Sequence, residues 1–405
     1  MKTLFIHQAF ITPNEFGGTR HYELAQLAAT KGHTFTIIAS DLNYMTGKKV
    51  AIDKQSDSNE TDEIQIVRSY TAPVHHRSFV WRIVSFFSFM VSSFFNGLKQ
   101  KQIDVVLGTS PPIFQAVSAW LISLIKQKPF LLEIRDLWPA FAVDMGVLKN
   151  PILIWLSYRL ENFLYARAEH IIVNSPAYKD YLTNNKKIAF DKVTLIPNGV
   201  DVERFSSSQA TNQIRDEYNL QNKFLITYAG ALGLANNIDL LLHAANHLKK
   251  HTDIHFLIVG DGKERPHLEL LKEQLHLSNV TFAGTRPKSE IPEILLSSDV
   301  CTAVLQDIPM FRMTYPNKVF DYMAASKPTL LAIDGVIRQV IEECDGGCYV
   351  SPSDANAYAD AVLNYYQNRN LASEQGIRAR DYVFKHFNRH THAEQFVEVL
   401  ERFSQ

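Results

Sequence analysis

The sequence predicts an α/β fold in which two doubly wound parallel-sheet domains face a central cleft. Short β-branched runs alternate with segments of helical periodicity along nearly all of the 405 residues, which is the pattern of βα units. A turn-rich break, IPNGVDVERF at 196–205, interrupts this alternation, which then restarts. The length suits two or three domains, and 46% hydrophobic with 20% charged residues indicates an ordinary folded protein with a sizeable core.

Strand-like runs occur both before and after the break, which indicates two domains of similar size. Those of the first half are KTLFIHQAF, FTIIAS, IQIVRS, DVVLGTS, PFLLEIRD, HIIVNS and VTLIP. Those of the second half are FLITYAGALG, IHFLIVGDG, VTFAGT, DVCTAVL and KPTLLAI. We expect a hinge near Pro197–Asn198–Gly199, and a final helical segment, about 374–404, that returns to the first domain. Because ligands of such sheets bind beyond the carboxyl ends of the strands, the expected site is the cleft.

The first strand-to-helix junction carries two adjacent glycines, Gly17 and Gly18, followed by Arg20. Glycine lets a ligand approach the main chain closely, and the N-terminus of the next helix favours anions. The Arg20 guanidinium offers a fork of donors suited to phosphate or carboxylate. A plain tight turn with a surface arginine is the alternative, since a glycine pair is a weak motif.

Charge and cysteine usage narrow the class of protein. The net charge of −1 hides a difference between the two halves of the chain. Residues 1–197 carry 21 Lys and Arg and 16 Asp and Glu, whereas residues 198–405 carry 20 Lys and Arg and 26 Asp and Glu. This mildly basic first half suits an anionic surface, but the imbalance is too small to indicate nucleic-acid binding. Three scattered cysteines favour a reducing compartment, and MKTLFIHQAF is too short an apolar run for a signal peptide, so we expect a cytoplasmic protein.

The most informative stretch is QDIPMFRMTYPNKVFDYMAASKPTLLA at 306–332. Its Tyr-Pro-Asn segment starts a helix, since proline is tolerated in the first helical turn, and Asn317 then stands at the helix start. Lys318 would lie near the free amides there, where a diphosphate is stabilised by amides and ammonium together. Asp321 follows one turn later and can accept two hydrogen bonds from a ribose diol. An amphipathic helix with a surface Lys–Asp pair is the alternative.

Taken in order, GGTRHYELAQLAATKGH, IPNGVD, YAGALG, IVGDGKER, VTFAGT and YPNKVFDYMAASKP resemble the GT-B glycosyltransferases of family 4 over essentially the whole chain. EIRDLWPA with GTSPP looks more narrowly like the O-antigen and capsule branch, which includes N-acetylfucosamine transferases. The resemblance implies two Rossmann-like domains. Residues 1–197, joined by a C-terminal helix at about 386–405, would form the acceptor side, and 198–385 would bind the nucleotide sugar.

The chain departs from the family in its donor site. In the family's Glu-x7-Glu element, the first acid binds hydroxyls of the donor sugar and the second acid binds the ribose. In this chain Asp321 stands at the second position, but Met313 stands at the first. A thioether does not replace a carboxylate's hydrogen bonds, so we expect a less polar donor sugar, 6-deoxy or N-acetylated, with Asp307 or backbone groups helping.

A second departure concerns the diphosphate. Many relatives have an Arg and a Lys after the glycine turn of the second domain, whereas this turn, bounded by Gly230 and Gly233, has neither. Lys318 and Arg312 are therefore the first candidates to meet the phosphate charge, with the amides around Gly17 and Gly18. Arg286, in AGTRPK, is expected near the base.

A third departure concerns catalysis. Where many relatives have His-Asp, this chain has Arg135-Asp136. The resemblance implies a hexosyltransferase type of enzyme that retains anomeric configuration, with stabilisation of the leaving group as its main device. Asp136 can alternatively act as a general base if it faces the cleft, with Arg20 beside the reacting groups and Glu15 a weaker base candidate. The alternative for Asp136 is a buried partner of Arg135 or Arg20.

The segment FVWRIVSFFSFMVSSFFNGLKQK at 79–101 is apolar but too short to span a bilayer. As a helix it has one narrow polar stripe, made of Arg82, Ser85, Ser88, Ser92, Asn96 and Lys99. The broad aromatic face includes Phe86 and Phe87 and suits a helix in the cytoplasmic face of the inner membrane. The acceptor is then a polyprenyl-diphosphate-linked saccharide, as in this branch of the family. A core helix of the outer layer is the alternative.

These observations favour a glycosyltransferase that moves a sugar from a UDP-sugar to a lipid-linked saccharide in surface polysaccharide synthesis. An epimerase of the UDP-N-acetylglucosamine 2-epimerase type, which needs no acceptor, and an inactive nucleotide-binding scaffold are the alternatives. No G-x-G-x-x-G fingerprint follows either glycine turn, which counts against a dehydrogenase. No D-x-D element and no His/Cys/Asp cluster with ligand spacing occurs, so we expect neither a cofactor nor an obligatory metal.

Overall fold

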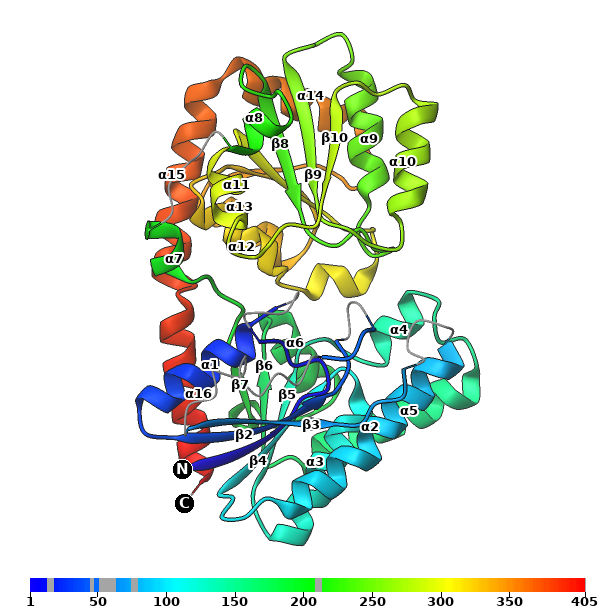
Figure 1. Ribbon diagram of the computed structural model, residues 1–405, viewed down its shortest axis with the longest axis vertical. Coiled ribbons are helices and arrows are strands. Elements are labelled where there is room, and N and C mark those ends of the chain that lie inside the picture. Colours follow the sequence, from blue (N-terminus) through cyan, green and yellow to red (C-terminus); the bar gives the residue numbers. More distant parts are fainter. Residues whose placement is uncertain (13–17, 44–46, 51–62, 74–78, 208–212, 405) are drawn as a thin grey trace. The chain divides into compact units, whose positions relative to one another are not determined.

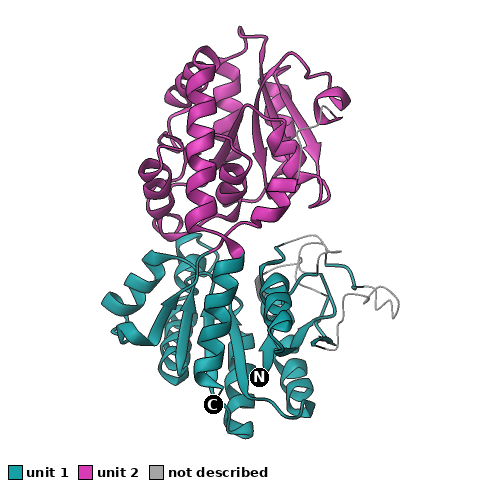
Figure 2. Cartoon of the chain, turned by 90° about the vertical axis from the view of Figure 1, so that its left-hand side faces the viewer, with its two compact units in different colours: residues 1–197, 390–405 teal, residues 198–389 magenta. Residues whose placement is uncertain are grey.

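A computed structural model of the chain describes residues 1–12, 18–43, 47–50, 63–73, 79–207 and 213–404. The chain divides into two compact units, one made of residues 1–197 and 390–405 and the other of residues 198–389 (Figure 2). Each unit has its own parallel sheet covered by helices on both faces.

Within the described residues, unit 1 is built on a seven-stranded parallel sheet in the order β3-β2-β1-β4-β5-β6-β7. The strands are β1 (Lys2–Ile6), β2 (Thr34–Ser40), β3 (Ile64–Ser69), β4 (Val105–Ser110), β5 (Phe130–Ile134), β6 (His170–Val173) and β7 (Val193–Leu195). The helices are α1 (Arg20–Thr30), α2 (Phe79–Lys99), α3 (Ile113–Lys126), α4 (Ala140–Asp144), α5 (Pro151–Arg167), α6 (Pro176–Asp180), the single turns η1 (Tyr181–Asn185) and η2 (Phe190–Lys192), and α16 (Arg389–Phe403). The order reverses beside β1, which creates a switch point between β1 and β4.

Alternate residues of the unit 1 strands pack against different helices. On one face, Phe5 and Leu107 join a core with Tyr22 of α1 and Phe396 of α16. On the other face α3 lies so close to β4 that a Cβ on Gly108 would be 2.8 Å from the Cβ of Ala119. Helix α2 packs beside α3 and against β2 and β3, so the two helices cover this face of the sheet together (Figure 1).

The described residues of unit 2 form a six-stranded parallel sheet in the order β10-β9-β8-β11-β12-β13. Its strands are β8 (Phe224–Ala229), β9 (Ile254–Val259), β10 (Val280–Gly284), β11 (Val300–Val304), β12 (Thr329–Ala332) and β13 (Gly347–Tyr349). Its helices are α7 (Val202–Ser207), α8 (Gln213–Glu217), α9 (Ile238–His247), α10 (Arg265–Gln274), α11 (Ile291–Leu296), η3 (Pro309–Met313), α12 (Asn317–Ala324), α13 (Val336–Glu343), α14 (Ala355–Gln367) and α15 (Arg369–His386). The switch point here lies between β8 and β11.

The predicted doubly wound α/β architecture is confirmed, and every strand-like run named above contains a strand. The short strand β13 was not predicted. It has three residues, Gly-Cys-Tyr, and such a run carries no readable alternation. All three cysteines are free, with Cys301 and Cys344 buried.

The loop after β9 is pressed against the glycine turn after β8. Gly260 has a φ of +137°, and a Cβ at this position would lie 1.9 Å from the carbonyl oxygen of Gly230. Both the backbone conformation and the space therefore require glycine. The two turns support each other at the carboxyl edge of the unit 2 sheet.

We expect Gly260→Ala to destabilise unit 2 by about 2 kcal/mol or more, because it combines strain with a backbone clash. Differential scanning calorimetry measures this as a lower melting temperature of the unit 2 transition. Gly233→Ala is the matched control, since a Cβ there meets no atom within 4 Å and no positive φ is involved. Equal melting temperatures for the two variants would contradict the packing described here.

Candidate functional site

Lys318 lies at the second position of helix α12, at the carboxyl edge of the unit 2 sheet. Its ammonium donates hydrogen bonds to the hydroxyl of Tyr228 and to Oδ1 of Asn236, each at 2.8 Å. The same Nζ lies 4.4 Å from the centroid of the Tyr228 ring. A Cβ on Gly230 would be 3.0 Å from Nζ, so a side chain at position 230 would crowd the ammonium.

The surroundings of this ammonium are neutral. Among the described residues no carboxylate oxygen lies within 4 Å of the Lys318 Nζ. Burial lowers the pKa of Lys318 to about 7, because a cation with little solvent is disfavoured. An anionic ligand would reverse this effect, since a neighbouring negative charge stabilises the ammonium form.

The turn that follows β8 offers main-chain donors beside the ammonium. The amides of Gly230 and Leu232 are used, since they donate to the carbonyls of Val259 and Asp261. The amides of Ala231, Gly233 and Leu234 make no hydrogen bond within the described part of the chain. Free amides next to an ammonium form a site suited to a phosphate group.

The start of α12 is fixed by contacts around it. The side-chain amide of Asn198 donates to the carbonyl of Tyr315 at 3.0 Å. This hydrogen bond connects the segment around Asn198 to the start of the helix. Asn317 is exposed and Asp321 is half-buried on the same helix. The structure thus brings Gly230, Lys318 and Asn317 to one edge, and the predicted ribose contact of Asp321 stays a prediction.

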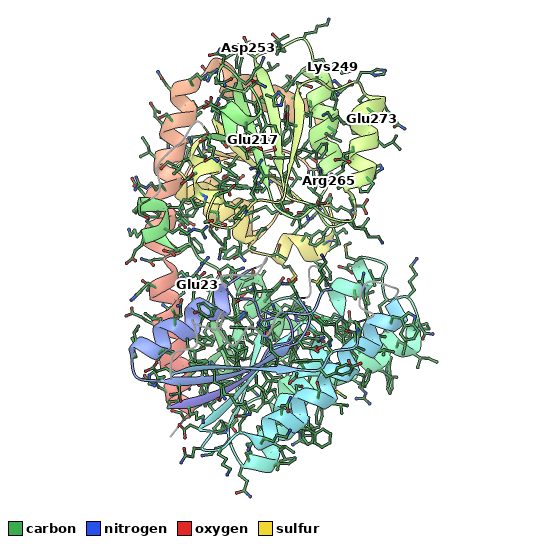
Figure 3. All side chains as sticks on the ribbon, viewed as in Figure 1. Glu23, Glu217, Lys249, Asp253, Arg265 and Glu273 are labelled. Carbon is green, nitrogen blue, oxygen red and sulfur yellow. The ribbon has the colours of Figure 1, made fainter. Side chains whose placement is uncertain are left out.

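Two other predicted cations make ion pairs of their own. Arg312 of η3 pairs with Asp307 at 2.7 Å, and both side chains are about half exposed. Arg286 follows the edge strand β10 and binds Glu217, labelled in Figure 3, together with the hydroxyl of Tyr218. Neither arginine contacts Lys318 among the described residues, so Lys318 alone of the three lies at the glycine turn.

In unit 1, Arg135 and Asp136 follow the carboxyl end of β5. The Arg135 Nε donates to the hydroxyl of Thr109 at 2.9 Å, and its Nη2 donates to the carbonyl of Pro111. Asp136 accepts a hydrogen bond from the hydroxyl of Tyr178 at 3.4 Å. Burial raises the pKa of Asp136 to about 6, although Arg135 and Tyr178 oppose the shift. At neutral pH the carboxylate is mostly ionised and is a better proton acceptor than an exposed one.

Arg20 has partners that the sequence did not predict. Its guanidinium binds Glu133 at 3.2 Å and donates to the carbonyls of Ile196 and Pro197. Glu133 is fully buried in β5 and also receives a hydrogen bond from His21 at 2.5 Å. Burial disfavours the Glu133 carboxylate, but His21 and Arg20 outweigh this and lower its pKa to about 2. The predicted catalytic role of Arg20 stays a prediction beside this structural one.

The other predicted site residues near the first glycine turn are Glu15, Gly17 and Gly18. Glu15 and Gly17 lie outside the described residues. Gly18 is exposed, and a Cβ there would meet no atom within 4 Å. A buried acid inside an apolar strand run, Glu133 in FLLEI, is the signal that would have revealed the Arg20 and His21 contacts from sequence.

Helix α2 turns the centre of its polar stripe toward the protein and leaves its apolar face exposed. The central members of its polar stripe face the protein: the Ser88 hydroxyl accepts from the Ala72 amide, the Ser92 hydroxyl donates to Tyr70 and the Asn96 amide donates to Ser69. The exposed face is apolar and consists of Trp81, Val84, Phe87, Val91 and Phe95. Phe86 is half-buried, whereas Arg82 and Lys99 are exposed. In the described part of the chain, no helix is both long and apolar enough to cross a membrane.

Each half of the chain matches one family of known proteins. Residues 17–204 match the model described as "Glycosyltransferase Family 4", and residues 223–368 match "Glycosyl transferases group 1". The chain belongs to the glycosyltransferases of the family 4 type. The curated relatives of this glycosyltransferase include the putative colanic acid biosynthesis glycosyl transferase WcaI of Escherichia coli, which is 23% identical over 78% of this chain and 79% of that protein. They also include the probable glycosyltransferase WbjE of Pseudomonas aeruginosa, 24% identical over 64% and 65%.

Solved structures share the fold of this glycosyltransferase. Sucrose-phosphate synthase of Thermosynechococcus elongatus has a TM-score of 0.78 at 18% identity and covers 99% of this chain, with 98% of its own chain matched. The HepE protein of Anabaena, solved in complex with UDP-glucose, has a TM-score of 0.75 at 16% identity over 99% and 100%. The fold is therefore the GT-B type with two Rossmann-like domains, as predicted.

Proposed function

We propose that this glycosyltransferase takes a sugar from a UDP-sugar and transfers it to a lipid-linked saccharide in the synthesis of a surface polysaccharide. The observation that carries the donor assignment is the Lys318 ammonium, whose partners among the described residues are neutral and which lies beside turn amides that bind none of these residues. A diphosphate bound there would gain charge-assisted hydrogen bonds from both. Asp321, one turn along α12, is the proposed ribose contact.

Known relatives support both the UDP-sugar donor and the role in surface polysaccharide synthesis. WcaI is named for colanic acid biosynthesis, and HepE was solved with UDP-glucose. A further structural neighbour, WaaG, is described as involved in lipopolysaccharide biosynthesis and has a TM-score of 0.70 at 16% identity over 98% of this chain. The narrower assignment to an N-acetylfucosamine transferase, with retention of configuration, is part of the proposal.

We expect a donor panel to favour UDP-linked 6-deoxy or N-acetylamino sugars. Met313 stands where the family's first acid binds donor hydroxyls, and a thioether is only a weak acceptor. Thermal-shift titration with UDP, GDP and their sugars measures this, because a ligand that binds only the folded state raises the melting temperature. A plain hexose donor such as UDP-glucose emerging as the best donor would contradict the assignment of Met313.

A membrane-bound acceptor is proposed because helices α2 and α5 of unit 1 expose sets of apolar side chains. Helix α2 exposes the face described above, and α5 exposes Ile152, Leu153, Trp155 and Leu156. Arginines accompany these side chains: the guanidinium of Arg159 lies 5.3 Å from the Trp155 ring centroid. Apolar and aromatic side chains with nearby cations suit a surface of anionic lipid.

We expect the variant Trp81→Glu/Trp155→Glu to lose most of its recovery with phosphatidylglycerol vesicles in a flotation assay. Each tryptophan is about half exposed, so the charges should remove membrane affinity without disturbing the core. The matched control, Leu270→Glu/Ile377→Glu, alters equally exposed apolar side chains of unit 2. Equal recovery of the wild type, the tryptophan variant and the control would contradict the proposed membrane contact.

The whole reaction is tested by incubating the full chain with the best UDP-sugar and a lipid-linked saccharide, with and without EDTA. The proposal expects a glycosidic product with retained configuration, formed without added metal. Conversion of the donor sugar without an acceptor would favour an epimerase. Nucleotide binding without any product would favour an inactive scaffold.

A further inference from the structure

An open groove with a volume of about 620 Å³ runs between helix α2 and the residues that follow β3. It is lined by Tyr70, Ile83, Val84, Phe87, Ser88, Val91 and Ser92. Tyr70, Phe87 and Val91 are each exposed by two fifths or more, so the groove opens to the surface. It belongs to unit 1 and to the face of α2 that is proposed to meet the membrane.

The lining of the groove is mostly carbon: its polar side chains are Tyr70 and two serines, and both serine hydroxyls already have hydrogen-bond partners. The Ser88 hydroxyl donates to the carbonyl of Ser85 and accepts from the Ala72 amide, both at 2.8 Å. The Ser92 hydroxyl donates to the carbonyl of Tyr70 at 2.7 Å. A peptide lying here would leave its main-chain groups unpaired, which costs free energy, whereas a hydrocarbon chain has none to pair.

Aromatic rings connect the groove with the carboxyl edge of the unit 1 sheet. The ring of Phe87 lies 4.7 Å, centroid to centroid, from that of Phe114 at the start of α3. Phe114 in turn lies 6.0 Å from Trp138. The Trp138 amide donates to the carbonyl of Asp136 at 3.0 Å, so the last ring of the series belongs to a residue whose main chain contacts that of the candidate base.

We propose that this groove receives the hydrocarbon chain of the lipid-linked acceptor, and that the Phe87–Phe114–Trp138 rings direct its polar end toward Asp136. The inference rests on the proposed function and names the part of the acceptor that the groove recognises. The occupant is a hydrocarbon chain because the lining is mostly carbon, the groove is open, and its residues continue onto the apolar face of α2. Affinity for the acceptor then increases with chain length.

The test compares the binding of farnesyl diphosphate and dimethylallyl diphosphate, which differ by ten carbons, to the full chain by calorimetry below the concentration at which either lipid self-associates. The wild type is expected to bind farnesyl diphosphate at least about 100-fold more tightly. Val91→Asp, at a half-exposed position, should reduce that ratio below about tenfold, whereas Leu270→Asp should keep it. No chain-length preference in the wild type, or an unchanged preference in Val91→Asp, overturns the inference.

Two further results separate this inference from the proposed function. If the wild type transfers no sugar but keeps its chain-length preference, the proposed function is wrong and the assignment of the groove to a hydrocarbon chain is supported. If it transfers sugar with no preference for either lipid, the groove alone fails. With p-benzoylphenylalanine at position 91, photocrosslinking to radiolabelled farnesyl diphosphate supports the inference, and crosslinking to a protein instead, in a mixture that contains both, overturns it.

Discussion

Replacing Lys318 with methionine is expected to weaken UDP binding at least tenfold, because it removes a charge-assisted contact to phosphate that commonly contributes about 1.5–3 kcal/mol. Methionine is unbranched and one heavy atom shorter than lysine, and it has no charge, so most of the packing beside Tyr228 is preserved. Isothermal titration calorimetry measures the loss. The melting temperature of the ligand-free variant should be equal or higher, since burial disfavours the ammonium in the free protein.

The control for this experiment is Lys249→Met. Lys249 follows helix α9 at the opposite edge of the same sheet and is labelled in Figure 3. Its removal should leave UDP affinity unchanged. If Lys318→Met bound UDP as well as the wild type did, Lys318 would not be a phosphate contact.

The same lysine predicts a pH dependence of donor binding. The pKa of Lys318 is lowered to about 7 in the free protein, so the ammonium is present below that pH and is lost as the pH rises through it. The affinity for UDP-glucose, whose diphosphate does not titrate in this range, should therefore fall between about pH 6 and pH 8. Lys318→Arg should flatten the profile, because arginine stays charged.

Replacing Asp136 with asparagine is expected to lower kcat by about 10²–10⁴, the usual contribution of a general base. The amide keeps the shape of the side chain and can still meet the Tyr178 hydroxyl, but it does not accept the acceptor's proton. In the wild type, kcat should fall as the pH drops below about 6, where the raised pKa leaves Asp136 protonated. Steady-state kinetics with a lipid-linked acceptor measure both effects.

Two measurements separate this role from a structural one. UDP affinity should be unchanged in Asp136→Asn, since the proposed donor contacts belong to unit 2. Asp191→Asn, at an exposed position of unit 1, should keep full kcat. A kcat for Asp136→Asn within threefold of the wild type would remove Asp136 from the chemistry and favour leaving-group stabilisation as the main device.

Most of the fold could be predicted from sequence because parallel strands are buried on both faces. Runs such as FTIIAS and IHFLIV are rich in apolar and β-branched residues, and each lies between turn residues and a periodic helix. Strand β13 was not predicted because a run of three residues is too short to show a periodic pattern. Periodicity located the polar stripe of α2, but the finding that this stripe lies against the protein needed the fold.

Lys318 could be proposed from sequence because its helix start is a local feature of the chain. Its partners Tyr228 and Asn236 are more than 80 residues away and come together only through the order of the strands. The same holds for Arg20, which pairs with Glu133 across 113 residues. Local patterns therefore identified individual candidates, while the pairs that determine pKa values needed the fold.

The central claim is that the nucleotide diphosphate binds at the carboxyl edge of the unit 2 sheet, against the turn after β8 and the start of α12. Hydrogen–deuterium exchange of the full chain with saturating UDP tests it most directly. We predict slower exchange of the amides in residues 229–236 and 315–322, with little change at the opposite edge of that sheet. Protection by UDP confined to segments outside these two stretches would contradict the account.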